Sequence, residues 1–292
     1  MKRQLQVHGA LTFVSLIYGA NYSIAKIATP EYIGPFGFIT VRVIISTALF
    51  WLIASFFPAD PIKHKRDYWQ LAKCALFGVA TNQLFFFKGL SLTSPIHGSL
   101  IITTVPIIVL VVSRLLLKET ITRSKITGIA LGFSGAIALI LNEGISLEND
   151  IFLGDVFIFL NAIAYGTYLV IVRPLMQRYS ALTLSKWVFF FGIFMVTPFG
   201  YNEAMTVSWN TLPQEAWFSI AFVIVGTTLI VYALNAWTLK YVKSATVGSY
   251  IYLQPVFATI IAILLEQDEF DPQKLIFALF IFCGVYLVSK GK

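Results

Sequence analysis

The stretch Thr93-Ser94-Pro95-Ile96-His97-Gly98-Ser99, continued through Pro106 to Lys118-Glu119, decides the fold of this chain. It begins with a polar cap, runs on as an apolar helix with one internal proline, and ends among basic residues. A degenerate second copy follows: Ser244–Ile251 aligns with Ser94–Ile101, Pro255 with Pro106, and Gly284 with Gly135. The hydropathy around both copies repeats in the same five-segment pattern. The chain therefore divides into two halves, residues 1–146 and 147–292, each built to pack against the other.

The composition is that of a membrane protein. The chain is 58% hydrophobic and 12% charged, whereas soluble domains carry roughly 25% charged residues. A transmembrane helix needs about 20 mostly apolar residues. Apolar windows of this kind cover residues 8–28, 35–57, 70–91, 95–117, 125–142, 152–173, 182–200, 215–239, 244–265 and 274–290. We therefore expect an all-α integral membrane protein with ten transmembrane helices, the first of them retained rather than cleaved as a signal peptide.

The basic residues gather on one side of this arrangement. With both termini in the cytoplasm, all 21 lysines and arginines fall on the inner side except Lys26, Arg42, Lys88 and Lys274. Lys and Arg in short loops mark the cytoplasmic side, so this distribution predicts how the chain is oriented in the inner (plasma) membrane. It also explains the net charge of +7 without a nucleic-acid partner. Five helices per half give the two halves opposite orientations. Such inverted repeats recur in transporters, with the substrate site near the midplane between them.

Three segments carry a family resemblance: Leu16-Ile-Tyr18-Gly19-Ala20-Asn21-Tyr22 with Lys26, Leu90 to Ser99, and Pro106 to Glu119. They resemble the EamA family of the drug/metabolite transporter superfamily. The family's first helix usually carries Trp-Gly-Ser/Ala-Asn, and here Tyr18 replaces the tryptophan. Its fourth helix has a mid-span proline followed by a glutamate, matched by Pro106 and Glu119, but blurred in the second half. The resemblance covers the whole chain and implies a ten-helix transporter, often an exporter of amino acids or related metabolites.

Three unusual cations lie in the outer halves of their predicted helices: Lys26, Arg42 and Lys88. A charge deep in hydrocarbon costs roughly 3 kcal/mol on insertion scales, so such residues face cavities or partners. Snorkelling to the outer interface explains Lys26 and Lys88 equally well. Arg42 lies deeper, and we expect it to pair with Glu31 or Asp155, or to bind a substrate carboxylate.

Polar stripes at helical spacing give the other candidates for substrate binding. Tyr18, Tyr22 and Lys26 share a stripe of the first helix, with Asn21 beside them, and Tyr165 and Tyr168 share one on the sixth. The remaining candidates are Asn82, Tyr232, Asn235 and Tyr252. The alternative for all of these is helix packing and interhelical hydrogen bonding. Pro106 and Pro255 are candidate hinges, or else static bends.

The sequence favours transport over other functions. It has no HExxH or GxSxG motif, so an integral-membrane enzyme is the remote alternative, and we expect neither a metal nor a cofactor. We expect the partners to be a small-molecule substrate and membrane lipid, in a monomer or a dimer. Amino acids are the leading substrate class; nucleotide sugars or other phosphorylated metabolites are the alternative. Because no carboxylate lies mid-span, we expect facilitated or exchange transport more than proton coupling, even with His97 near the outer end.

Overall fold

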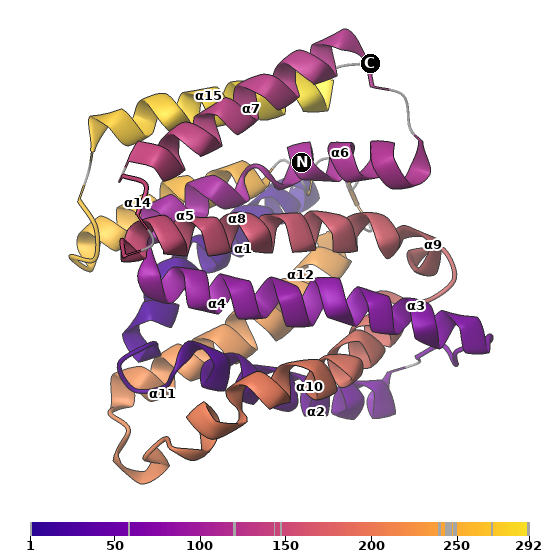
Figure 1. Cartoon of the computed structure of the whole chain (residues 1–292). Helices are drawn as coiled ribbons and strands as arrows, with labels where there is room; N and C mark the ends of the chain where they lie inside the picture. The colour runs from indigo at the N-terminus through magenta and orange to yellow at the C-terminus, as the bar shows by residue number, and fades with distance from the viewer. Residues whose placement is uncertain are drawn as a thin grey trace.

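The computed structural model describes residues 2–57, 59–118, 121–142, 144–146, 148–238, 241–242, 247, 250–269 and 271–290, and all regular secondary structure in these ranges is helical (Figure 1). The first half comprises α1 (Lys2–Ala28), α2 (Pro35–Phe56), α3 (Lys65–Ala75), η1 (Leu76–Thr81), α4 (Asn82–Leu92), α5 (Pro95–Ile102), α6 (Val105–Leu117) and α7 (Arg123–Asn142). The second half comprises α8 (Asp150–Ile171), α9 (Arg173–Met176), α10 (Ala181–Met205), η2 (Trp209–Thr211), α11 (Gln214–Ala221), η3 (Phe222–Ile230), α12 (Val231–Thr238), η4 (Tyr250–Leu253), α14 (Gln254–Leu264) and α15 (Pro272–Lys290).

The helices have the lengths and composition of a multi-pass membrane protein. Within the described residues, six helical stretches are long and apolar enough to cross a membrane: Pro35–Phe56, Pro95–Leu117, Arg123–Asn142, Asp150–Ile171, Ala181–Met205 and Gln214–Asn235. Two shorter apolar helices cover Tyr250–Leu264 and Pro272–Val288. The predicted segments 8–28 and 70–91 lie on α1 and on the run from α3 through η1 to α4, which are helical but more polar. Glu119 and the start of the predicted segment 244–265 lie outside the described residues, Val247 excepted.

Two helix pairs form opposite edges of the bundle, α7 against α15 and α2 against α10 (Figure 1). Glycines bring each pair together. A Cβ on Gly284 of α15 would lie 2.4 Å from the backbone nitrogen of Gly132 on α7, and one on Gly200 of α10 would lie 2.0 Å from the carbonyl oxygen of Phe36 on α2. Small residues allow such close approach of membrane helices. Each pair joins a helix of the first half to its counterpart in the second.

The two aligned prolines begin helical segments and do not lie within continuous helices. Pro106 is in the first turn of α6, after a turn at Thr103 and Thr104, and Pro255 is in the first turn of α14, after the 3-10 segment η4. Proline is favoured at a helix start because the missing N–H has no intrahelical partner there. The predicted span 95–117 is therefore one apolar stretch, Pro95–Leu117, that a turn at Thr103 and Thr104 divides into α5 and α6. A hinge role for either proline stays a prediction.

Two π-helical segments interrupt the third and eighth predicted spans at corresponding places. η1 separates α3 from α4, and η3 separates α11 from α12. A π-helical turn carries an i to i+5 hydrogen-bond pattern and occurs often at functional sites. The polar residues of both spans that face the centre of the bundle lie within or directly after these segments.

Candidate functional site

A cavity of about 200 Å³ lies in the middle of the bundle. It is lined by Tyr18, Asn21 and Tyr22 of α1, Arg42 of α2, Asn82, Gln83 and Phe86 of α4, Ile102 of α5, Asn161 and Tyr165 of α8, Thr227 of η3, Ile251 of η4 and Gln254 of α14. Pockets for drug-sized ligands measure roughly 300–1,000 Å³. This cavity is smaller, so its size suits a small metabolite, and its lining mixes aromatic rings with hydrogen-bonding groups.

Arg42 carries the charge of this cavity. Its side chain is 9% exposed. One guanidinium nitrogen donates to Gln83 Oε1 at 2.7 Å, and the other donates to Thr227 Oγ1 at 3.1 Å and to Thr228 Oγ1 at 3.4 Å. Within the described residues no carboxylate pairs with Arg42. All of its protein partners there are neutral, so no described carboxylate compensates the positive charge in the cavity wall.

A chain of amides extends from Arg42 across the cavity. Gln83 Nε2 donates to Asn82 Oδ1 at 2.7 Å, and Asn161 Nδ2 donates to the carbonyl oxygen of Asn82 at 2.7 Å. Because Gln83 uses its oxygen to accept from Arg42, its nitrogen must face Asn82. The carbonyl of Asn82 likewise fixes the orientation of the Asn161 amide. The network therefore holds the guanidinium in one place from helices of both halves.

Tyrosines form much of the remaining wall. The ring of Tyr22 is 4% exposed and packs edge-on against Phe86, with ring centroids 5.6 Å apart. Tyr165 stacks on Tyr168 at 6.2 Å. The backbone of α14 passes close to α1, since a Cβ on Gly19 would lie 2.9 Å from the carbonyl oxygen of Gln254. Glycine at this position allows the second-half segment that carries Gln254 to reach the cavity.

The structure brings half of the predicted binding residues to the cavity: Tyr18, Asn21, Tyr22, Arg42, Asn82 and Tyr165. Lys26 lies one turn beyond Tyr22, and its Nζ donates to the carbonyl oxygen of Thr93 at 2.6 Å. Lys88 is half-buried on α4, outside the cavity lining. Both lysines are on helices that line the cavity, but they lie closer to the end of the bundle than the lining residues do.

Tyr168, Tyr252 and Asn235 also lie outside the cavity lining. Tyr168 packs on Gly78, where a Cβ would lie 2.5 Å from its ring. Tyr252 packs edge-on against Phe282 at 6.3 Å. Asn235 lies on α12 outside the cavity lining, and the side chain of Tyr232 is outside the described residues. The shared reason is helical rotation: a stripe read from spacing alone does not say which face turns inward.

Other lining residues were not among the predicted binding residues. Gln83 fits the alternative of interhelical hydrogen bonding, yet it both holds Arg42 and lines the cavity. Asn161 is on the same stripe as Tyr165, and Gln254 precedes Pro255, so a sequence signal existed for both. Nothing in the sequence distinguishes the lining residues Phe86, Ile102 and Ile251 from ordinary apolar residues of their helices.

The carboxylate of Asp155 was an expected counter-ion for Arg42, and the structure assigns it a different partner. Asp155 Oδ2 lies 2.7 Å from Nδ1 of His97, and both side chains are buried, at 0% and 1% exposed. Thr93 donates its hydroxyl to the other carboxylate oxygen. The pair lies where α5 and α8 begin, toward the end of the bundle where Lys26 lies.

A second carboxylate cluster lies at the opposite end, between α3 and the segment from α9 to α10. Arg178 Nη1 donates to both oxygens of Asp67, at 2.8 and 2.9 Å, and the hydroxyl of Tyr179 donates to Asp67 Oδ2 at 2.6 Å. The Tyr179 hydrogen bond and the Arg178 guanidinium lower the pKa of Asp67 below its ordinary value. Burial and the bond to Asp67 raise the pKa of Tyr179. Among the described residues no group of three or more His, Cys, Asp or Glu could hold a metal ion.

Comparisons with known proteins agree with this architecture. The chain matches the EamA-like transporter family over residues 8–141 and again over residues 152–290. It is 25% identical over 268 residues to the uncharacterized transporter YyaM of Bacillus subtilis, covering 89% of this chain and 86% of that protein. It is 25% identical over 329 residues to the protein WALLS ARE THIN 1 of Arabidopsis thaliana, covering 99% and 84%. One crystal structure shares the fold with a TM-score of 0.63 at 16% identity, over 95% of each chain. The protein is a multi-pass membrane protein that belongs to the EamA-like transporter family.

Proposed function

We propose that this protein is a secondary transporter that moves small amphipathic metabolites, foremost amino acids or related compounds, across the plasma membrane by alternating access. The observation that carries the proposal is Arg42, a cation in the wall of a small central cavity whose partners among the described residues are all neutral. Leaving a buried charge without a counter-ion is costly. A carboxylate of the substrate would supply the missing negative charge.

The proposed architecture is ten transmembrane helices in two inverted repeats, with both termini in the cytoplasm. Three observations support it: the family matches the chain twice in succession, the π-helical segments η1 and η3 occupy corresponding places, and Pro106 and Pro255 begin corresponding helices. The bias of Lys and Arg toward one side supports the orientation. The proposed direction, export, follows the resemblance to exporters of this family.

The cavity favours amino acids over nucleotide sugars and other phosphorylated metabolites. A phosphate carries up to two negative charges and is usually bound by several converging Lys or Arg side chains. Arg42 is the only cation among the lining residues that the structure describes. Lys26 and Lys88 lie outside this lining, and the aromatic walls suit an apolar side chain. A single guanidinium matches one carboxylate.

The test is counterflow in proteoliposomes across the amino acids, with empty vesicles as reference. For a substrate exchanged by the wild type, Arg42→Gln removes the charge but keeps a polar side chain. Charge-assisted hydrogen bonds contribute about 1.5–3 kcal/mol, so the apparent affinity should fall by roughly 10- to 100-fold. Arg114→Gln is the matched control, because Arg114 is exposed near the end of α6, and it should leave the affinity unchanged.

Two results would contradict the proposal. If no amino acid exchanges above empty vesicles, the proposed substrate class is wrong. If Arg42→Gln leaves the affinity unchanged for every transported solute, Arg42 is a structural residue.

A further inference from the structure

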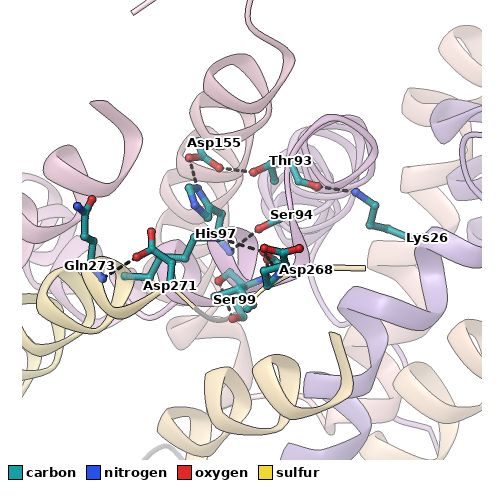
Figure 2. A network of polar contacts seen from close by, with 12 residues as sticks. Lys26, Thr93, Ser94, His97, Ser99, Asp155, Asp268, Asp271 and Gln273 are labelled. Carbon is teal, nitrogen blue, oxygen red and sulfur yellow. Dashed lines mark hydrogen bonds and ion pairs between the residues drawn. The ribbon is translucent and has the colours of Figure 1, made fainter. Parts of the chain in front are cut away.

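A network of polar side chains lies at the end of the bundle at which α1 ends and α5 and α8 begin (Figure 2). At its centre, His97 Nδ1 and Asp155 Oδ2 are 2.7 Å apart, and the Thr93 hydroxyl donates to Asp155 Oδ1. Lys26 Nζ donates to the Thr93 carbonyl oxygen at 2.6 Å. The backbone of His97 donates to Ser94 Oγ at 3.2 Å, which caps α5.

This network connects three helices that also line the cavity. On α5, the lining residue Ile102 follows His97 by five residues; on α8, the lining residue Asn161 follows Asp155 by six. On α1, Lys26 follows Tyr22 by one turn, and Tyr22 itself packs beside α5, since a Cβ on Gly98 would lie 3.4 Å from its ring. Opening the cavity toward this end requires these helices to separate, and therefore requires the network to break.

We propose that the His97–Asp155 pair is a proton-binding site that controls the opening of the cavity at this end. The proposal rests on the transport function proposed above and adds a means of regulating it. The ligand is a proton, bound at His97 and shared with the Asp155 carboxylate.

The charges around the pair determine what a proton does there. Asp268, in the segment between α14 and α15, pairs with Lys274 in the first turn of α15 at 3.1 Å, and Asp268 Oδ2 also accepts from the backbone of Ile96 at 3.4 Å. Lys26 from α1 contributes one further positive charge, and Asp271, three residues after Asp268, contributes one further negative charge (Figure 2). The Lys26 ammonium contacts the Thr93 carbonyl, not Asp155. With neutral His97, the pair itself carries the full negative charge of Asp155 in a buried site. A proton on His97 makes the pair neutral overall.

The sign of the effect follows from burial. In the closed arrangement the side chains of His97 and Asp155 are 1% and 0% exposed, so a net charge on the pair is penalised. Once the end opens, water reaches the pair and this penalty falls. The closed state therefore binds the proton more tightly than the open state, and by linkage proton uptake favours closure. The preference for closure is complete in acid, where His97 is protonated in both states, and is lost as the pH rises until His97 is protonated in neither.

This placement bears on one prediction from the sequence. Because no carboxylate lies mid-span, the sequence predicts facilitated or exchange transport more than proton coupling, and it places Asp155 near a helix end. The helix end is buried, however, because α4 and α5 pack against it, and Asp155 meets the one histidine of α5 there. The carboxylate that the sequence places at the periphery lies inside a closed polar network.

The first experiment observes the proton without any substrate. The chain has three histidines, His8, His64 and His97, so [15N]histidine spectra of the full chain in nanodiscs resolve a small set of signals. The signal missing in His97→Asn should titrate, and Asp155→Asn should shift its midpoint. A His97 signal that stays in one protonation state from about pH 5 to about pH 9, on both sides of the ordinary histidine pKa of about 6.5, overturns the proposal.

The second experiment observes the opening. Ile102→Cys, in a background with Cys74→Ala and Cys283→Ala, places a thiol at the cavity wall, and a polar maleimide reports access to it. Ionisation of the thiol speeds the reaction at high pH in every background, so the readout is the rate relative to the same protein carrying His97→Asn. If the closed state binds the proton about tenfold more tightly than the open state, protonation shifts the opening equilibrium by the same factor. The relative rate should be near unity at about pH 8.5 and fall about tenfold at about pH 5.5.

Two variants sharpen the result. Asp155→Asn removes the negative charge and should give slow labelling with no such pH dependence. His8→Asn is the matched control, because the Nδ1 of His8 is also hydrogen-bonded, to the Tyr250 hydroxyl at 2.6 Å, but His8 is exposed. This variant should behave as the wild type.

A relative rate that does not change with pH, alongside intact counterflow, overturns the proton site and leaves the transport proposal standing. The pH-dependent rate without counterflow of any amino acid supports the proton site and overturns the substrate class.

Discussion

The two ends of the bundle use similar chemistry in opposite surroundings. At one end Asp155 binds a histidine ring and a threonine hydroxyl; at the other Asp67 binds an arginine and a tyrosine hydroxyl. His97 and Asp155 are 1% and 0% exposed, whereas Arg178, the partner of the buried Asp67, is 41% exposed. The first pair is dry, and the second is open to water on its cationic side.

This difference in exposure indicates which end of the bundle responds to pH. Water and salt screen the exposed Arg178–Asp67 contact, so its net contribution is small. The arginine also stays charged at every physiological pH, so this contact does not change between pH 5 and 8. The His97–Asp155 pair is buried, and histidine is the residue type whose ordinary pKa lies in that range. The end with the buried His97–Asp155 pair can respond to pH, whereas the end with the Asp67–Arg178 contact only holds its segments together.

The largest expected loss of stability comes from removing Asp155 from its buried pair with His97. Asp155→Ala removes the acceptor of both the Thr93 hydroxyl and the His97 ring, in a site that is closed to bulk water. Breaking a buried pair by removing one partner destabilises by about 3 kcal/mol, and thermal unfolding in detergent measures the loss. Asp155→Asn keeps the shape and one acceptor and should lose less. A loss of stability below about 1 kcal/mol for Asp155→Ala, the size of an exposed pair, would mean that the site relaxes or hydrates freely.

The end of the bundle at Asp67 should tolerate the loss of its exposed cationic partner. Arg178→Gln removes the guanidinium from Asp67 but leaves the Tyr179 hydrogen bond in place. Exposed ion pairs contribute about 0.2–1 kcal/mol, so unfolding should shift by no more than that, and the shift should shrink further at high salt. A loss as large as that of Asp155→Ala would show that the two ends do not differ in the way their exposure indicates.

Much of this arrangement was predictable because membrane insertion imposes simple rules. Long apolar windows predicted helices throughout, and each falls on a helix wherever the structure describes it. Arg42 stood out in the sequence because a cation deep in an apolar helix is costly unless it faces a cavity or a polar partner. The stripe on α1 pointed to Tyr18 and Tyr22 for a related reason: polar groups in such a helix need partners.

The rest depended on rotation and backbone irregularity, which spacing does not reveal. Tyr168 and Tyr252 are on plausible stripes, yet packing turns them toward Gly78 and Phe282. The π-helical segments η1 and η3 shift the face of everything that follows them, so the joint roles of Gln83 and Thr227 around Arg42 could not be read from periodicity. The His97–Asp155 pair joins residues far apart in the chain, and only the packing of α5 on α8 brings them together.

The smallest expected effect is at Tyr179: its substitution should change the melting temperature by the same amount across the neutral pH range. This prediction is the strictest test of the difference between the two ends of the bundle. Tyr179→Phe removes the main cause of the lowered pKa of Asp67. A carboxylate with a lowered folded-state pKa contributes stability that is complete above its unfolded value of about 3.9 and is lost as the pH falls through the folded-state pKa. The difference in melting temperature between Tyr179→Phe and the wild type should therefore be constant from about pH 5.5 to about pH 8.5 and shrink only in stronger acid. The same difference for His97→Asn should vary across that interval, because a proton taken up by a histidine acts in the opposite sense and at higher pH. Parallel curves for the two variants would mean that the end with the His97–Asp155 pair is no more a proton sensor than the end with the Asp67–Arg178 contact.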